Sequence, residues 1–189
     1  TAQEIEIANQ GSILQVLGMT EKKGKWNIDN HIDKDLLASY IKSSHLENER
    51  LAGQKITNTL VSVNKDITSK YITQELFLNN IEITEEHIKS FYNSKEFIDL
   101  YESSEIPIHT LPISYKIDEK KIISDPVGLT AQMLTVKWHV ISISKNQLKE
   151  INELLDASDL HMKQCVLAPY ASSLAAINEM ESSLGVICL

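Results

Sequence analysis

Residues 124–144, SDPVGLTAQMLTVKWHVISIS, limit the fold of this chain more than any other segment. Pro126 fixes its own φ and Gly128 accepts a positive φ without steric cost, so a tight turn is expected over residues 125–129. The positions that follow alternate between two faces, which predicts one long strand. One face carries Val136, Trp138 and Val140, and the other carries Lys137, His139 and Ile141. A stiff turn and a long strand therefore stand midway between two helical regions.

The first third of the chain has the pattern strand, strand, helix, strand. Residues 5–17 alternate around the turn-forming residues 9–12, which predicts a hairpin. Asp29 or Asp33 is expected to cap the helix that follows. The apolar face of this helix is expected to be Leu36, Leu37, Tyr40 and Ile41. The β-branched run at 55–66 then predicts a buried strand.

The middle of the chain begins with a strand and a helix. Residues 69–78 read as a strand, and Asn79 with Asn80 predicts a turn at its end. Thr84 is expected to cap a helix over residues 84–97, because a threonine hydroxyl accepts from a free backbone N–H in the first turn. Two glutamates follow in that first turn, where the helix dipole favours negative charge.

The segment after this helix is extended and contains two prolines. Pro107 and Pro112 lack backbone donors, so residues 105–118 are expected to form an edge strand or one interrupted by bulges. A charged hairpin tip at 118–121 leads to the turn and long strand described above. The order strand, helix, strand, strand indicates a small α+β unit over about 69–144, inserted into a larger α/β domain.

The last third returns to an α/β pattern. Ser144 and Gln147 have the spacing of a capping box at the start of a helix. The face that this helix buries is expected to be Leu148, Ile151, Leu154 and Leu155. A strand over 161–169 precedes a helix over 170–180, with a proline where the helix can begin. Residues 184–189 read as the opening of one more strand.

Composition excludes several classes of protein. The 189 residues carry 26 acidic and 18 basic side chains, a net charge of −8, so nucleic acid is not an expected partner. No apolar run approaches the roughly 20 residues that cross a bilayer, and no signal peptide is recognised. Cys165 and Cys188 stand in apolar stretches without C-x-x-C spacing, which is typical of buried thiols in a reducing cytosol.

The usual chemical motifs are missing from the sequence. The six histidines have neither H-x-x-x-H nor H-E-x-x-H spacing, so no metal site is expected. They are His31, His45, His87, His109, His139 and His161. No G-x-S-x-G, S-x-x-K, P-loop or G-x-G-x-x-G sequence occurs. The residues alone therefore predict a scaffold without catalytic residues.

The turn, the strands beside it and the end of the chain resemble the FtsA family of bacterial cell-division proteins. That family has an LH-x-IP-x-x-Y strand, a DP-[IV]-G-[LM] turn and a strand ending VHIVT. The matching residues here are His109, Pro112, Tyr115, Asp125, Pro126, Val127, Gly128, Leu129, His139 and Val140. EITEEHI at 82–88 is similar to the family's EVTEEDI, and residues 167–189 look like its LEPLASALAVLTEDEKELGVALV.

This resemblance implies an α/β fold, the actin-like (ribonuclease H-like) subdomain 1A, with a small α+β subdomain 1C inserted. Residues 1–68 would be the first part of subdomain 1A, and residues 69–144 would be the strand–helix–strand–strand subdomain 1C. Residues 145–183 would complete subdomain 1A, and 184–189 would start the next strand, in subdomain 2A.

The resemblance also implies a function. Members of the family bind ATP with Mg²⁺, polymerise as actin-like filaments and tether the ring of the tubulin-like protein FtsZ to the cytoplasmic membrane. The implied place is the cytoplasm, at the inner face of that membrane at the division septum. Subdomain 1C would contact other copies and later division proteins. The regions that bind FtsZ and the C-terminal membrane helix have no counterpart in these residues, so the sequence is expected to be a piece of a longer protein.

The candidate site residues follow from the turn. Asp125, Pro126, Gly128 and Leu129 are the expected partner-contact residues. The phosphate loops of the family would lie outside residues 1–189, so no ATP contact falls on a numbered residue. Ala168 stands where related actin-fold ATPases carry the glutamate of an EP-x-A-A motif. That departure implies weak or absent ATP hydrolysis, because alanine cannot accept a proton from water.

Three other functions remain open from the sequence. An FtsA-like type IV pilus assembly protein would share the fold and a related inserted module. An actin-fold kinase, such as a sugar kinase, would need a catalytic carboxylate and the phosphate loops. A stand-alone interaction module would bind no nucleotide. Phosphate loops in the sequence flanking Thr1 and Leu189 would exclude that last class.

Overall fold

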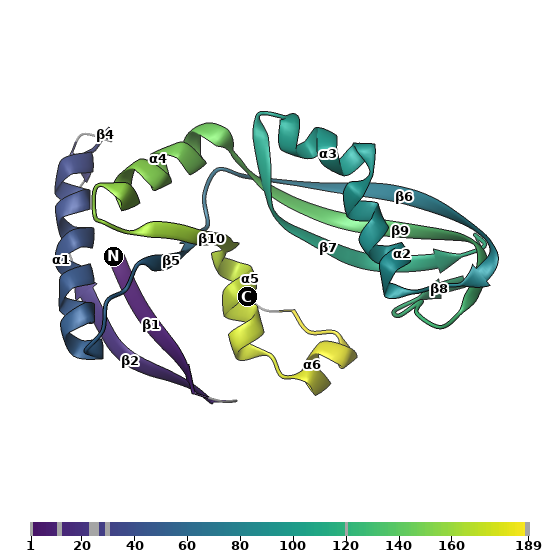
Figure 1. Ribbon diagram of the computed structural model, residues 1–189, viewed down its shortest axis with the longest axis horizontal. Coiled ribbons are helices and arrows are strands. Elements are labelled where there is room, and N and C mark those ends of the chain that lie inside the picture. Colours follow the sequence, from purple (N-terminus) through teal and green to yellow (C-terminus); the bar gives the residue numbers. More distant parts are fainter. Residues whose placement is uncertain (1, 11–12, 23–26, 29–30, 120, 188–189) are drawn as a thin grey trace. The chain divides into compact units, whose positions relative to one another are not determined.

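The structure, a computed structural model, describes residues 2–10, 13–22, 27–28, 31–119 and 121–187 (Figure 1). The chain divides into two compact units, which are described separately. The first unit is Thr1–Val61 with Leu148–Cys165, and the second is Ser62–Gln147 with Val166–Leu189.

The first unit opens with the predicted hairpin. Strands β1 (Ala2–Gln10) and β2 (Ile13–Lys22) pair antiparallel, with a register shift at Glu6/Ile7. The two turn residues at 11–12 lie outside the described residues. The strands β3 (Asn27–Ile28) and β4 (His31–Ile32) form a second, very short antiparallel pair that the sequence did not predict.

Helix α1 (Lys34–Ala52) packs against β1 and β2. Asp33 caps it as predicted, because its Oδ1 accepts from the backbone N–H of Leu36 at 2.9 Å; Asp29 lies outside the described residues. The expected apolar face is half-buried. The fully buried positions of α1 are polar: Ser44, His45 and Asn48. The inner surface of this helix is therefore more polar than the sequence pattern predicted.

Strand β5 (Asn58–Val63) completes the predicted ββαβ order and pairs with β10 (His161–Leu167). Helix α4 (Lys145–Asp156) begins where the predicted capping box stands. Ser144 Oγ accepts from the N–H of Gln147 at 3.1 Å, but the Gln147 side chain donates to the Lys65 carbonyl at 3.0 Å. Half of the capping box is therefore formed.

The second unit contains a four-stranded antiparallel sheet in the order β6-β9-β7-β8. Its strands are β6 (Ile67–Glu82), β7 (Glu105–Ile117), β8 (Lys121–Ile123) and β9 (Thr130–Ser144). The long predicted strand is β9, and it lies between β6 and β7. Helices α2 (Glu85–Ser90) and α3 (Lys95–Glu102) cover one face of the sheet (Figure 1).

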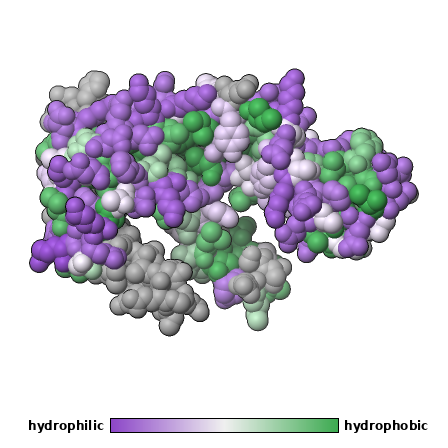
Figure 2. Space-filling model, in the orientation of Figure 1, coloured by the Kyte–Doolittle hydropathy of each residue, from purple (hydrophilic) through white to green (hydrophobic). Residues whose placement is uncertain are grey.

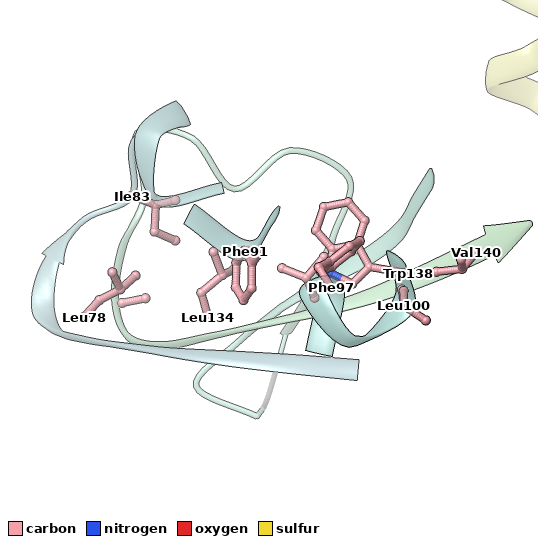
Figure 3. Packing of buried hydrophobic residues seen from close by; sticks show 10 residues of the cluster. Leu78, Ile83, Phe91, Phe97, Leu100, Leu134, Trp138 and Val140 are labelled. Atoms are coloured by element: carbon pink, nitrogen blue, oxygen red, sulfur yellow. The ribbon is translucent and has the colours of Figure 1, made fainter. Parts of the chain in front are cut away.

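The core of this unit lies between that sheet face and the helices. The alternation predicted for β9 is confirmed, since Val136, Trp138 and Val140 are fully buried while Lys137 is exposed. Around Trp138 the rings of Phe91 and Phe97 approach edge-on, with centroids 6.2 and 5.4 Å away (Figure 3). The cluster is Leu78, Ile83, Phe91, Phe97, Leu100, Ala131, Leu134, Val136, Trp138 and Val140.

The turn predicted at Asn79 and Asn80 is wrong, because β6 continues through both residues. They adopt φ of 53° and 63° and form a bulge, in which Phe77 pairs with Met133 and Ile81 pairs with Ala131. Asparagine tolerates the left-handed region better than most residues, so two extra residues fit into the strand without ending it.

The single helix predicted over 84–97 is also wrong. The α2 helix, a 3₁₀ turn (Phe91–Asn93) and α3 replace it. Ser94 is extended, and its Oγ accepts from the N–H of Phe97 at 3.4 Å, which starts a new helix. A serine hydroxyl that caps the next turn competes with continuation of the helix. Thr84 caps α2 as predicted, and His87 completes the capping box.

The prolines of β7 act as predicted. Register shifts relative to β9 occur between Pro107 and His109 and between Pro112 and Ser114. Strand β7 pairs with β8 only over residues 115–117, so most of its length lies at the edge of the sheet. The short strand β8 itself was not predicted, because three residues give too little alternation to recognise.

The end of the chain differs from the expected helix over 170–180. Helix α5 (Ala168–Ala176) starts earlier, with the proline in its first turn, and α6 (Glu179–Leu184) follows. Asn178 Oδ1 accepts from the N–H of Glu181 at 2.9 Å, so this residue caps α6 instead of continuing α5. The strand predicted over 184–189 is not formed in residues 185–187, where no described segment pairs with them; residues 188–189 lie outside the described residues.

Candidate partner-contact site

The predicted turn joins β8 to β9 at one end of the second unit. Gly128 has φ of 84°, and the N–H of Leu129 donates to the carbonyl of Pro126 at 3.2 Å. Asp125 Oδ1 accepts from the N–H of Val127 at 3.0 Å, which closes the preceding residues into a second small turn. The turn geometry expected from proline and glycine is therefore present.

Two backbone hydrogen bonds fasten this turn to the end of β6. The N–H of Gly128 donates to the Ile83 carbonyl at 2.9 Å, and the N–H of Ile83 donates to the Leu129 carbonyl at 2.8 Å. Ile83 is fully buried in the core, and so is the ring of Pro126. The turn is consequently held by the core on one side and by backbone pairing on the other.

The turn and the end of β6 both carry exposed apolar side chains. Val127, Leu129 and Ile81 are 43%, 41% and 48% exposed. We call these three residues the tip surface, and Figure 2 shows hydrophobic residues at this right-hand end of the view. Asp125 is exposed beside them. Because hydrogen bonds hold the turn in one conformation, little conformational entropy would be lost when its apolar side chains bind another surface.

The structure separates the roles of the four predicted contact residues. Asp125, Gly128 and Leu129 lie at the surface of the turn, whereas Pro126 is buried and anchors it. Ile81 and Val127 were not among the predicted contact residues. An apolar residue on each side of a glycine was the available signal for Val127. No local signal marked Ile81, which lies in β6 beyond the bulge and pairs with Ala131.

At this end of the unit, Tyr115 is an ionisable group whose pKa is shifted. Burial raises the pKa of Tyr115, and Tyr92 and Asp125 add smaller effects in the same direction. Within the described residues no group of histidine, cysteine, aspartate or glutamate side chains is arranged to hold a metal ion. With its exposed apolar side chains, the tip surface is suited to packing against another surface.

Ala168 lies elsewhere in the second unit, as the first residue of α5, and is half-buried. The residue before it, Leu167, donates its N–H to Nε2 of His109 at 2.9 Å. The ring of Tyr170 meets the His109 ring edge-on at 5.0 Å. Leu167 and Tyr170, on either side of Ala168, thus contact a histidine of β7, which the sequence did not predict.

Comparison with known proteins gives consistent results. Residues 53–142 match the family model described as the SHS2 domain inserted in FtsA. The chain is 28% identical to the cell division protein FtsA of Buchnera aphidicola (Schizaphis graminum) over 96% of its length and 43% of that protein's. It is 27% identical to FtsA of Agrobacterium fabrum over 81% of its length and 34% of that protein's. It thus spans about two fifths or less of these relatives.

A solved structure supports the fold. A chain of the PilM-PilN type IV pilus biogenesis complex matches 92% of this chain and 46% of its own length, with a TM-score of 0.53 and 12% identity. That likeness concerns the fold alone. In the described part of the chain, no helix is both long enough and apolar enough to cross a membrane.

These matches confirm the predicted fold class, an α/β actin-like fold with a small inserted α+β subdomain. The inserted part carries the turn, the tip surface and the Trp138 core described above. Residues 53–142 thus match the SHS2 domain inserted in FtsA, and the chain is similar to FtsA cell-division proteins over most of its length.

Proposed function

We propose that this chain is part of a cell-division scaffold in which the SHS2 domain makes protein contacts through the tip surface. The observation that carries the proposal is the pair of exposed residues Val127 and Leu129 on a turn fastened twice to Ile83, together with exposed Ile81 near the end of β6. A rigid apolar projection without a nearby catalytic group is suited to binding a protein surface. A second copy of the protein and later division proteins are the proposed partners.

The remaining parts of the proposal rest on the similarity to FtsA. The intact protein would bind ATP with Mg²⁺, polymerise as an actin-like filament and connect an FtsZ ring to the cytoplasmic membrane. It would act at the inner face of that membrane, at the division septum. Residues 1–68 and 145–183 would then be subdomain 1A, residues 69–144 subdomain 1C, and 184–189 the start of subdomain 2A.

We assign no nucleotide or metal contact to a residue of this chain. Phosphate loops would lie outside 1–189, and the described residues hold no cluster of metal ligands. Ala168 supports slow or absent hydrolysis, because its methyl group can neither accept a proton nor hold a water molecule by a charge-assisted hydrogen bond. In this proposal ATP acts as a conformational ligand.

Depletion of the intact protein in its own cells tests the proposed function. Loss of a division scaffold should give long undivided cells, and the unmodified protein supplied again should restore division. A protein with Leu129→Asp should be made at the normal level but fail to restore it. Normal division together with a loss of pili would contradict the proposal and favour the pilus assembly alternative.

A further inference from the structure

One contact in the second unit joins two segments that are far apart in the sequence. His109 lies in β7, within the SHS2 domain, and Leu167 directly precedes α5, outside that domain. The N–H of Leu167 donates to Nε2 of His109 at 2.9 Å. Tyr170, in the first turn of α5, places its ring edge-on to the His109 ring at 5.0 Å and an interplanar angle of 62°.

The donor in this hydrogen bond determines the state of the histidine ring. A backbone N–H always donates, so Nε2 of His109 must carry a lone pair. The proton of the neutral ring is then on Nδ1. An imidazolium carries protons on both nitrogens and cannot accept from Leu167, so protonation breaks this contact.

The start of α5 follows directly on β10, whose last residue is Leu167. Leu167 is its N-cap residue, and no side-chain hydrogen bond caps the helix. Pro169 in the first turn has no N–H to donate. Together with β10, the bond to His109 therefore fixes the backbone immediately before Ala168 in the absence of a side-chain cap.

We infer that His109 is a proton-sensitive latch between β7 of the SHS2 domain and the start of α5. While the ring is neutral, the latch is closed and α5 begins at a fixed position against β7. When the ring is protonated, Leu167 loses its acceptor and the start of α5 is released.

The surroundings of His109 favour the closed state. Burial lowers its pKa, so the neutral ring predominates at neutral pH. On α5 the ionisable group that contacts it is Tyr170. On β9 its paired residue is the apolar Ile141, and the next ring on that strand is His139. His139 is held elsewhere, by Ser69 Oγ at 2.7 Å and by stacking on Tyr71. Among the described residues no carboxylate or ammonium group contacts the His109 ring.

Amide hydrogen exchange of Leu167, measured by NMR between pH 5 and 8, tests the latch. Exchange is expressed as protection relative to the intrinsic rate at each pH, with the amide of Trp138 reporting global unfolding. In the unmodified chain we expect protection of Leu167 to fall about three- to tenfold as the pH drops, the effect of losing one hydrogen bond. Nitrogen chemical shifts should show the His109 ring protonated on Nδ1 at high pH.

Two variants of His109 distinguish a proton-sensitive latch from a purely structural role of this histidine. The amide oxygen of His109→Gln can take the place of Nε2 and does not titrate, so Leu167 should stay protected at every pH. His109→Phe keeps the ring but removes the acceptor, so protection should be low at every pH. His139→Gln, on the neighbouring strand, should keep the pH dependence of the unmodified chain.

Either of two results would overturn the latch. One is protection of Leu167 that does not change with pH in the unmodified chain although the His109 ring titrates. The other is equal protection in the glutamine and phenylalanine variants, with Trp138 still protected in both. These measurements need neither nucleotide nor division partners, so they are independent of the proposed function.

Discussion

The backbone N–H of Gly128 donates to the carbonyl oxygen of Ile83 across 2.9 Å, and Gly128 makes this contact at a φ of 84°. A Cβ added at this glycine would meet no atom within 4 Å, so there is space for a side chain. The positive φ, and not crowding, therefore disfavours other residues at this position. Gly128→Val should therefore lower the free energy of unfolding by about 1–3 kcal/mol. Denaturant unfolding of the chain measures this change.

Gly128→Asn is the matched control, because asparagine tolerates a positive φ far better than valine. It should lose clearly less stability than the valine variant. Equal losses in the two variants would mean that the positive φ is not the reason for glycine at this position.

Trp138 occupies the centre of the SHS2 core, where it is fully buried between the rings of Phe91, Tyr92 and Phe97. Trp138→Ala should cost about 3–5 kcal/mol of unfolding free energy, because it leaves a large cavity. Trp138→Phe should cost less, since a ring still fills much of the space. Thermal unfolding followed by circular dichroism measures both, and an alanine variant as stable as the phenylalanine variant would contradict the described packing.

The pKa of His109 predicts how stability changes with pH. Burial holds this pKa below its ordinary value of 6.5, so the folded state binds fewer protons than the unfolded state as the pH falls. The contribution of the neutral His109 ring to the free energy of unfolding is fully present above pH 6.5. It is lost as the pH drops from there through the folded-state pKa. Comparing unfolding free energies at pH 7.5 and 5 should show a smaller decrease for His109→Gln than for the unmodified chain. An equal decrease would assign the pH dependence to other groups.

The sequence predicted features that depend on neighbouring residues or on a regular period. The Asp33 cap, the hairpin of β1 and β2 and the two faces of β9 follow from local chemistry and from alternation, and all three are present. Prediction from the sequence failed where the local structure depends on pairing with residues far away in the sequence. The bulge at Asn79 and Asn80 forms because β9 continues to pair with β6 on both sides of it.

The candidate site was predictable in part for the same reason. Proline and glycine indicated the turn, but its attachment to Ile83 depends on how β6 ends. The exposure of Ile81, which lies in β6 beyond the bulge, could not be read from spacing either. The contact of His109 with Leu167 joins residues 58 positions apart, and no local pattern reports such a pair.

Ala168 leads to a prediction about ATP hydrolysis by the intact protein. We expect steady-state turnover to be slow or absent, because losing a general base typically reduces a rate by a factor of about 10² to 10⁴. Ala168→Glu should raise it, and Ala168→Gln, which has a similar size but no basic carboxylate, should not. Fast turnover by the unmodified protein would contradict the prediction, and another carboxylate would then have to activate the water.

The central claim is that the tip surface makes protein contacts, and sedimentation velocity of the intact protein across a concentration series tests it most directly. The unmodified protein should self-associate, and Leu129→Asp should weaken association about tenfold or more, as expected for a charge placed in an apolar contact. Ile98→Asp is the control, because Ile98 is a similarly exposed residue of α3, 49% against 41% for Leu129. It should leave association unchanged. A Leu129→Asp protein that associates as strongly as the unmodified one would contradict the claim.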